Sequence, residues 1–167
     1  MGTETWPFLA AHHSAGSLQL EVVATYSWTT AAPPTTEFGF SVLGNTGANV
    51  TISCGPQNVD APCMVRMLTN GVHGQLNASL YPHVGPVLPL DTKTVTVHTI
   101  VDHQIVETIV NNRTAIVSYY PSIPTASATE VALFGVVSGI EAEIKTWQLD
   151  AANNFAAGGG YGGRGYH

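Results

Sequence analysis

One stretch of the sequence, residues 94–120, consists almost entirely of β-branched and aliphatic residues. Side chains of this kind suit a pleated, well-buried sheet. Two polar interruptions divide the stretch, Asp-His-Gln at 102–104 and Asn-Asn-Arg at 111–113. Because Asn and Asp tolerate the backbone conformations of tight turns, the stretch predicts three antiparallel strands joined by two hairpins.

Shorter segments on both sides show the strand period of two, in which apolar and polar residues alternate. They predict further strands over 18–28, 37–44, 44–54 (after an initial turn), 64–68, 76–82, 130–137 and 140–149. We expect the last two to form a hairpin around Ser138-Gly139. The segment 83–93 is interrupted by prolines and is predicted to be a loop.

No segment shows the 3.6-residue period of a helix. Many short strands at regular spacing predict an all-β fold, an antiparallel β-sandwich of two stacked sheets, concanavalin-like or jelly-roll-like. The chain of 167 residues is long enough for one such domain, which we place at 17–150. Residues 1–16 are predicted to be an N-terminal arm with a polar turn at 12–14, and the Gly/Tyr-rich residues 151–167 a tail.

Charge excludes some classes of partner. The net charge is −6, and the five basic residues are scattered: Arg66, Lys93, Arg113, Lys145 and Arg164. They form no stripe that could neutralise a row of phosphates, so nucleic acid is not expected as a partner. No apolar run approaches the roughly 20 residues of a membrane span.

The first residues lack the basic and apolar regions of a signal peptide, so we expect either a cytosolic protein or a processed piece of a longer one. Three glycosylation sequons, at Asn49, Asn77 and Asn112, favour a secreted or vacuolar protein, with the cytoplasm as the alternative. Cys54 and Cys63 bracket a Gly/Pro/Asn-rich loop and form either a disulfide or two reduced thiols. Neither belongs to a closely spaced ligand pair, so no zinc site is expected.

The strands from 94 to 149 carry a family resemblance. Val101-Asp102 ends one strand, Ile105-Val106-Glu107 begins the next, and an Asn-containing turn leads to a Thr-rich return strand from Thr114. An aliphatic-Phe strand ending at Phe134 and a closing strand with Trp147 follow. This pattern resembles the C-terminal β-sandwich module of glycoside hydrolase family 32, the fructosidases and invertases. With a looser match upstream, the resemblance covers about residues 17–150.

The resemblance implies that catalysis resides elsewhere. The family's nucleophile and acid/base lie in a five-bladed propeller, and its motifs Asn-Asp-Pro-Asn, Arg-Asp-Pro and Glu-Cys do not occur in this sequence. Asp102 and Glu107 are close in sequence, but a hairpin tip offers little enclosure for an acid/base pair, so we expect structural roles for both. We therefore expect no catalytic residue and no cofactor, and the chain is not expected to be an enzyme by itself.

Histidines and aromatic rings are the residues that could bind a metal ion or a sugar. His98 and His103 lie on opposite faces of their strand by parity, which argues against a shared metal ion. Sugar binding needs exposed aromatic rings beside polar groups, for which Trp28, Tyr119 and Tyr120 are the candidates. Trp147 is expected in the core or against a preceding domain.

Two functions are therefore in competition. The first is a non-catalytic structural or interaction subunit whose partners are other protein chains, a family 32 propeller among them. The second is a free carbohydrate-binding module or lectin, for which family 32 sandwich modules that bind fructans provide an analogy.

Overall fold

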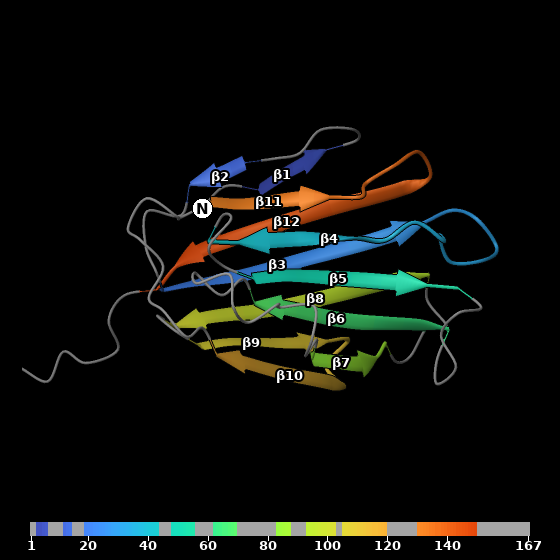
Figure 1. The fold of residues 1–167 in the computed structure, drawn as a ribbon. Helices are drawn as coiled ribbons and strands as arrows, with labels where there is room; N and C mark the ends of the chain where they lie inside the picture. The colour runs from blue at the N-terminus through green and yellow to red at the C-terminus, as the bar shows by residue number, and fades with distance from the viewer. Residues whose placement is uncertain are drawn as a thin grey trace, which may run out of the picture.

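The computed structural model describes residues 3–6, 12–14, 19–43, 48–55, 62–69, 83–87, 93–102, 105–119 and 130–149. These residues form two six-stranded sheets, which Figure 1 shows one over the other. Every paired strand runs antiparallel to its neighbour, and the described residues contain no helix. The predicted all-β sandwich is confirmed. Within this part of the chain there is no helix that could cross a membrane.

Each sheet combines strands from both ends of the chain. Sheet A consists, in spatial order, of β1 (Thr3–Trp6), β12 (Ile140–Gln148), β3 (Gln19–Trp28), β8 (Thr94–Asp102), β9 (Ile105–Val110) and β10 (Thr114–Tyr119). Sheet B consists of β2 (His12–Ser14), β11 (Glu130–Phe134), β4 (Phe38–Val42), β5 (Ala48–Cys54), β6 (Cys63–Thr69) and β7 (His83–Pro86).

The three-strand meander predicted from residues 94–120 is confirmed as β8, β9 and β10. Asn111 and Asn112 both have positive φ, 50° and 54°, and the Arg113 N–H donates a 2.9 Å hydrogen bond to the Val110 carbonyl, as in a β-turn with two left-handed central residues. The Asn111 side chain also accepts a hydrogen bond from the Thr96 backbone N–H at 2.9 Å. This contact ties the hairpin turn to β8, because Thr96 lies on that strand.

The predicted hairpin between 130–137 and 140–149 is wrong. A turn does lie at Ser138-Gly139, but β11 pairs with β2 and β4 in sheet B, whereas β12 pairs with β1 and β3 in sheet A. The chain changes sheet after Gly135, which has a φ of 68° and lies against the backbone of Glu37. Local turn residues do not reveal this crossover, because it depends on a contact with a distant segment.

Two further predictions need correction. The polar turn expected at 12–14 is strand β2, and part of the loop expected over 83–93 is strand β7. β7 is an edge strand of sheet B, where a proline can take part because its missing N–H need not be paired. The strand predicted at 76–82 and the tail at 151–167 lie outside the described residues. The division into arm, domain and tail stays a prediction.

The interior between the sheets is filled by inward-facing residues of both. In β3 burial alternates without interruption, so Leu20, Val22, Ala24, Tyr26 and Trp28 face sheet B. The largest fully buried side chains include Tyr26, Phe38, Phe40, Leu20, Leu43, Ile52 and Met67. The same alternation turns every second residue of β3, β8, β9, β10 and β12 away from the interior, onto the outer face of sheet A.

Candidate functional site

The outer face of sheet A is the set of side chains on β12, β3, β8, β9 and β10 that point away from sheet B. The strand register places Val23, His98 and Ile109 side by side on three neighbouring strands. Ile105 and Val117, on β9 and β10, are 48% and 53% exposed. Large aliphatic side chains are thus left open to solvent on adjacent strands, as at many protein-binding surfaces.

Trp147 belongs to the same face. It lies on β12, directly opposite Glu21 of β3, and is half-buried. Its predicted position in the core is wrong, because the register turns its side chain away from sheet B; the alternative, contact with another domain, stays a prediction. The alternation of 140–149 in the sequence predicts this orientation, because Trp147 is an odd number of residues from the buried Ile140, Ala142 and Ile144 and so lies on the other face of the strand.

Carboxylates surround these apolar groups. The outward residues that the structure describes on these strands include one lysine, Lys145, and five acids, Glu21, Asp102, Glu107, Glu141 and Glu143. Lys145 Nζ lies 3.0 Å from Glu143 Oε1, and His98 Nε2 lies 2.7 Å from Glu21 Oε1. Gln19 Nε2 donates a 2.8 Å hydrogen bond to Asp102 Oδ1. The face therefore combines an aliphatic strip with an excess of negative charge.

A hollow of about 350 Å³ opens on this face between β3 and β12. Its polar lining consists of Thr25, Ser27, Glu141 and Glu143. Two hydroxyls and two carboxylates present hydrogen-bond acceptors to anything that enters, and the carboxylates favour a cation or a donor-rich group.

The outer face of sheet B differs in burial. Thr51 and Ser53 point outward from β5, yet they are only 6% and 7% exposed. Phe134 of β11 lies directly opposite Gly39 of β4, and its ring atom Cζ would be 3.0 Å from a Cβ on that glycine. Nε of Arg66 on β6 is buried and has no hydrogen-bond partner. This face is closed over much of its described central part.

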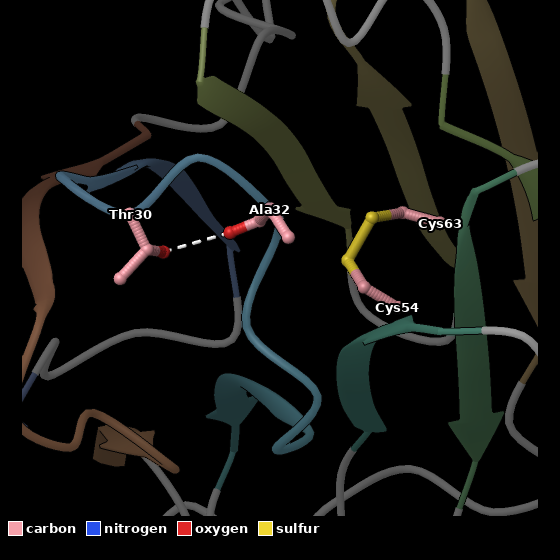
Figure 2. Close-up of a disulfide and its surroundings, with 4 residues drawn as sticks. All are labelled: Thr30, Ala32, Cys54 and Cys63. Atoms are coloured by element: carbon pink, nitrogen blue, oxygen red, sulfur yellow. Dashed lines mark hydrogen bonds between the residues drawn. A yellow bond between two sulfur atoms is a disulfide. The ribbon is translucent and has the colours of Figure 1, made fainter.

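Two cysteines of sheet B form a disulfide. Figure 2 shows Cys54 at the end of β5 bonded to Cys63 at the start of β6, and the two residues are directly opposite in the strand register. Of the two states that the sequence left open, the disulfide is confirmed. The nearby turn after β3 is closed by a 2.7 Å hydrogen bond that Thr30 Oγ1 donates to the Ala32 carbonyl.

One titratable side chain lies entirely inside the sandwich. The Tyr26 hydroxyl is buried and has no hydrogen-bond partner, and its ring centroid lies 4.9 Å from that of Phe38. Burial raises the pKa of Tyr26, because the charged phenolate is disfavoured away from water. Tyr26 faces no described hollow, so it joins the core rather than a site.

Of the aromatic residues proposed for sugar binding, only Trp28 has a side chain that the structure describes. Trp28 is only 5% exposed, so the expectation that its ring is open to solvent is wrong. Its place at the end of β3 continues the inward alternation of that strand. Tyr119 ends β10, but its side chain and all of Tyr120 lie outside what the structure describes.

The sequons occupy different surroundings. Asn112 is exposed at the β9–β10 turn, whereas Asn49 is half-buried within β5 and the hydroxyl residue of its sequon, Thr51, is buried. Asn77 lies outside the described residues. The geometry therefore favours Asn112 over Asn49 as a position that can carry a glycan on the folded domain.

Asp102 and Glu107 lie on the neighbouring strands β8 and β9, both exposed on the outer face of sheet A. His98 pairs with Glu21 on that face, and His103 lies outside the described residues. Among the residues described, no group of three or more His, Cys, Asp or Glu side chains is arranged to hold a metal ion.

One family model and several solved structures are similar to this chain. The family model described as "Glycosyl hydrolases family 32 C terminal" matches residues 3–149. The fold is similar to part of an exo-inulinase from Aspergillus awamori, with a TM-score of 0.66 and 14% identity over 90% of this chain and 29% of the enzyme. No curated protein matches the sequence.

Two other solved structures share the fold. A β-fructofuranosidase from Aspergillus kawachii, complexed with glycerol, has a TM-score of 0.61 and 16% identity over 86% of this chain and 26% of its own. A galectin from Caenorhabditis elegans has a TM-score of 0.58 and 10% identity, over 87% of this chain and 96% of its own. The present chain thus spans less than a third of the two enzymes but almost all of the galectin.

Proposed function

We propose that this chain, which belongs to the family of C-terminal domains of family 32 glycosyl hydrolases, is a non-catalytic module that packs against a larger protein. The observation that carries the proposal is the match of that family over residues 3–149. It confirms the resemblance first seen in the strands from 94 to 149. The fold is shared with only 29% and 26% of two longer enzymes, which supports a role as one part of a multidomain protein.

The outer face of sheet A supports the same function. Ile105, Val117 and Trp147 present apolar surface there, and a module that packs against a neighbour needs such a surface. The partner that we propose is a family 32 propeller, in the same precursor or in a separate chain. Because disulfides persist in oxidising compartments, the Cys54–Cys63 bond supports a secretory or vacuolar location, where the exposed Asn112 is the favoured glycan position.

Crosslinking in the cells that produce the chain tests this function. An amine-reactive reagent can attack Lys93 and Lys145, and mass spectrometry then identifies the attached peptides. We expect peptides from a polypeptide that contains the propeller motifs Asn-Asp-Pro-Asn and Arg-Asp-Pro. The purified chain should release no fructose from sucrose or inulin. A chain that stays monomeric and uncrosslinked in its cells, or that hydrolyses either sugar, would contradict the proposal.

Glycan binding is the second candidate. The observation in its favour is the shared fold with a galectin, a lectin by name, over 96% of that protein. Tyr119 and Tyr120 remain the proposed aromatic contacts. Isothermal titration of the purified chain with levan, inulin and sucrose tests the idea, with Tyr119→Ala and Tyr120→Ala as the variants. Absence of heat with all three sugars would remove fructans as ligands.

A further inference from the structure

We infer that the outer face of sheet A docks a protein surface that combines basic side chains with apolar ones. The inference rests on the proposed function and deepens it, because it names the face of this module and the chemistry of the surface that covers it. Three features of this face support it: an exposed apolar strip, an unbalanced charge, and the size of the face.

The apolar strip runs across adjacent strands. The register aligns Trp147, Glu21, Ile100, Glu107 and Val117 in one row across β12, β3, β8, β9 and β10. Apolar and acidic residues therefore alternate along that row. Ile105, one step along β9 from Glu107 on the same face, extends the exposed apolar surface beside Val117. A covering surface must match both chemistries at a spacing of about 4.8 Å from strand to strand.

The negative charge of the face requires positive charge on the surface that covers it. Lys145 offsets one of the five carboxylates on the face, through its contact with Glu143. Asp102 and Glu21 have partners within the face, Gln19 and His98, so a covering surface without basic groups would chiefly desolvate Glu107 and Glu141, at a cost in free energy. The hollow beside Glu141 and Glu143, at about 350 Å³, can admit the guanidinium of an arginine, which carboxylates bind in a bidentate fashion.

The size of the face suits a protein partner. The five strands have six to ten residues each, which together give an area of roughly 650 Å², against about 800 Å² per partner in an ordinary protein interface. A second copy of this chain is a poor occupant, because the same acidic face would meet itself. The centre of the sheet B face is less suitable, since its outward Thr51 and Ser53 are already buried and its exposed Val84 lies on the edge strand β7.

The test uses the purified chain and three acetylated, amidated pentapeptides: Arg-Val-Arg-Val-Arg, Glu-Val-Glu-Val-Glu and Arg-Ser-Arg-Ser-Arg. In an NMR titration, the first should shift amide signals of outward residues on β9, β10 and β12. Its affinity should exceed that of both other peptides by about tenfold and fall as NaCl is added. Equal binding of the acidic peptide, or shifts confined to sheet B, would overturn the inference.

Variants separate the two chemistries. Val117→Ser removes exposed apolar surface, and the double change Glu141→Gln with Glu143→Gln removes the charge at the hollow. Each should weaken binding of the first peptide by roughly threefold or more. The matched control is Glu37→Gln, an exposed carboxylate outside this face, which should leave binding unchanged. Unaltered binding by both face variants, or dimerisation of the chain through this face, would overturn the inference.

The same variants, placed in the producing cells, separate this inference from the proposed function. If the Val117 and Glu141/Glu143 variants crosslink to a propeller-bearing partner as well as the natural chain does, the docking face is wrong and the proposed function stands. If the natural chain gives no such crosslink, the proposed function itself fails.

Discussion

The two outer faces of the sandwich are built from six antiparallel strands each, yet they differ in what they leave open. On sheet A, Ile105 and Val117 are about half exposed, and carboxylates surround them. On sheet B, Thr51 and Ser53 are buried although they point away from the core, and a phenylalanine ring covers Gly39. The central part of the sheet B face is therefore covered, although Val84 on the edge strand β7 is 48% exposed; on sheet A the exposed aliphatic side chains lie on adjacent strands beside carboxylates.

The difference also shows where tolerance to substitution should lie. A closed face transmits any change in side-chain volume to its neighbours, because packed groups have little room to move. An open face absorbs the same change at little cost, since surface substitutions usually alter stability by no more than about 0.5 kcal/mol. Substitutions that separate stability from binding can therefore test whether the two faces differ as described.

The largest effect is expected from Gly39→Ala on the closed face. A Cβ there would lie 1.9 Å from the Val50 carbonyl oxygen, so the β4–β5 backbones would have to move apart. Overpacking of this kind should lower the free energy of unfolding by about 3 kcal/mol. Urea denaturation measures it. On the open face, Thr25→Ala should cost about 0.5 kcal/mol or less. A loss of stability equal to that of Gly39→Ala would mean that the two faces do not differ in packing.

Removal of the disulfide comes next. The bond joins two strands of sheet B and closes a loop with a sequence separation of nine. Replacing both cysteines, Cys54→Ser with Cys63→Ser, should lower the free energy of unfolding by roughly 2.5 kcal/mol on the chain-entropy estimate. Reductant should destabilise the natural chain similarly and leave the double variant unaffected. Peptide binding by sheet A should persist; its loss would mean that the two faces are not independent.

A gain in stability is expected from Tyr26→Phe, in the interior that both sheets share. The change removes a buried hydroxyl without a partner and keeps the ring beside Phe38, so the free energy of unfolding should rise by about 1 kcal/mol. Because burial raises the pKa of Tyr26, the phenol ionises first in the unfolded chain, so the natural protein loses stability as pH rises above the ordinary value of about 10. The variant should therefore resist alkaline unfolding better, and a lower stability at neutral pH would show that the hydroxyl has a hidden partner.

The smallest effect is expected on the open face itself. Glu21→Gln removes the carboxylate that lies 2.7 Å from His98. Since the pair is partly exposed to solvent, its loss should change the free energy of unfolding by about 0.5 kcal/mol or less, and less still in high salt. Thermal unfolding at two salt concentrations measures the change. A loss of several kcal/mol would mean that this face is as tightly packed as that of sheet B.

Patterns within short segments allowed much of the fold to be predicted. The meander of β8, β9 and β10 follows from β-branched runs broken by Asn and Asp, because neighbouring strands in a hairpin need only a local turn. The crossover after Gly135 could not be predicted in this way, since its partner is the backbone near Glu37, about a hundred residues earlier. β7 was missed because its proline, Pro86, is tolerated only at a sheet edge, and edge positions depend on topology.

In the candidate site, too, features that depend on one strand could be predicted, whereas features that depend on the register between distant strands could not. Alternation alone indicates that Trp147 and Glu143 share a face of one strand, and the disulfide was one of two states that the cysteine spacing allowed. Which strands would lie beside β12, and hence which carboxylates would gather near Val117, depends on register across the whole sheet. Trp28 was placed wrongly because a neighbouring Pro/Thr-rich loop suggested exposure, whereas the alternation of its own strand directs it inward.

The central claim, that sheet A carries the docking face of a non-catalytic module, is tested most directly by hydroxyl-radical footprinting of the assembled protein. Oxidation of Trp147 and Met64 would be compared between the isolated chain and its assembly in the producing cells. Trp147 lies on the outer face of sheet A and Met64 on that of sheet B, so only Trp147 should become protected. Unchanged oxidation of Trp147, with Met64 protected instead, would contradict the claim.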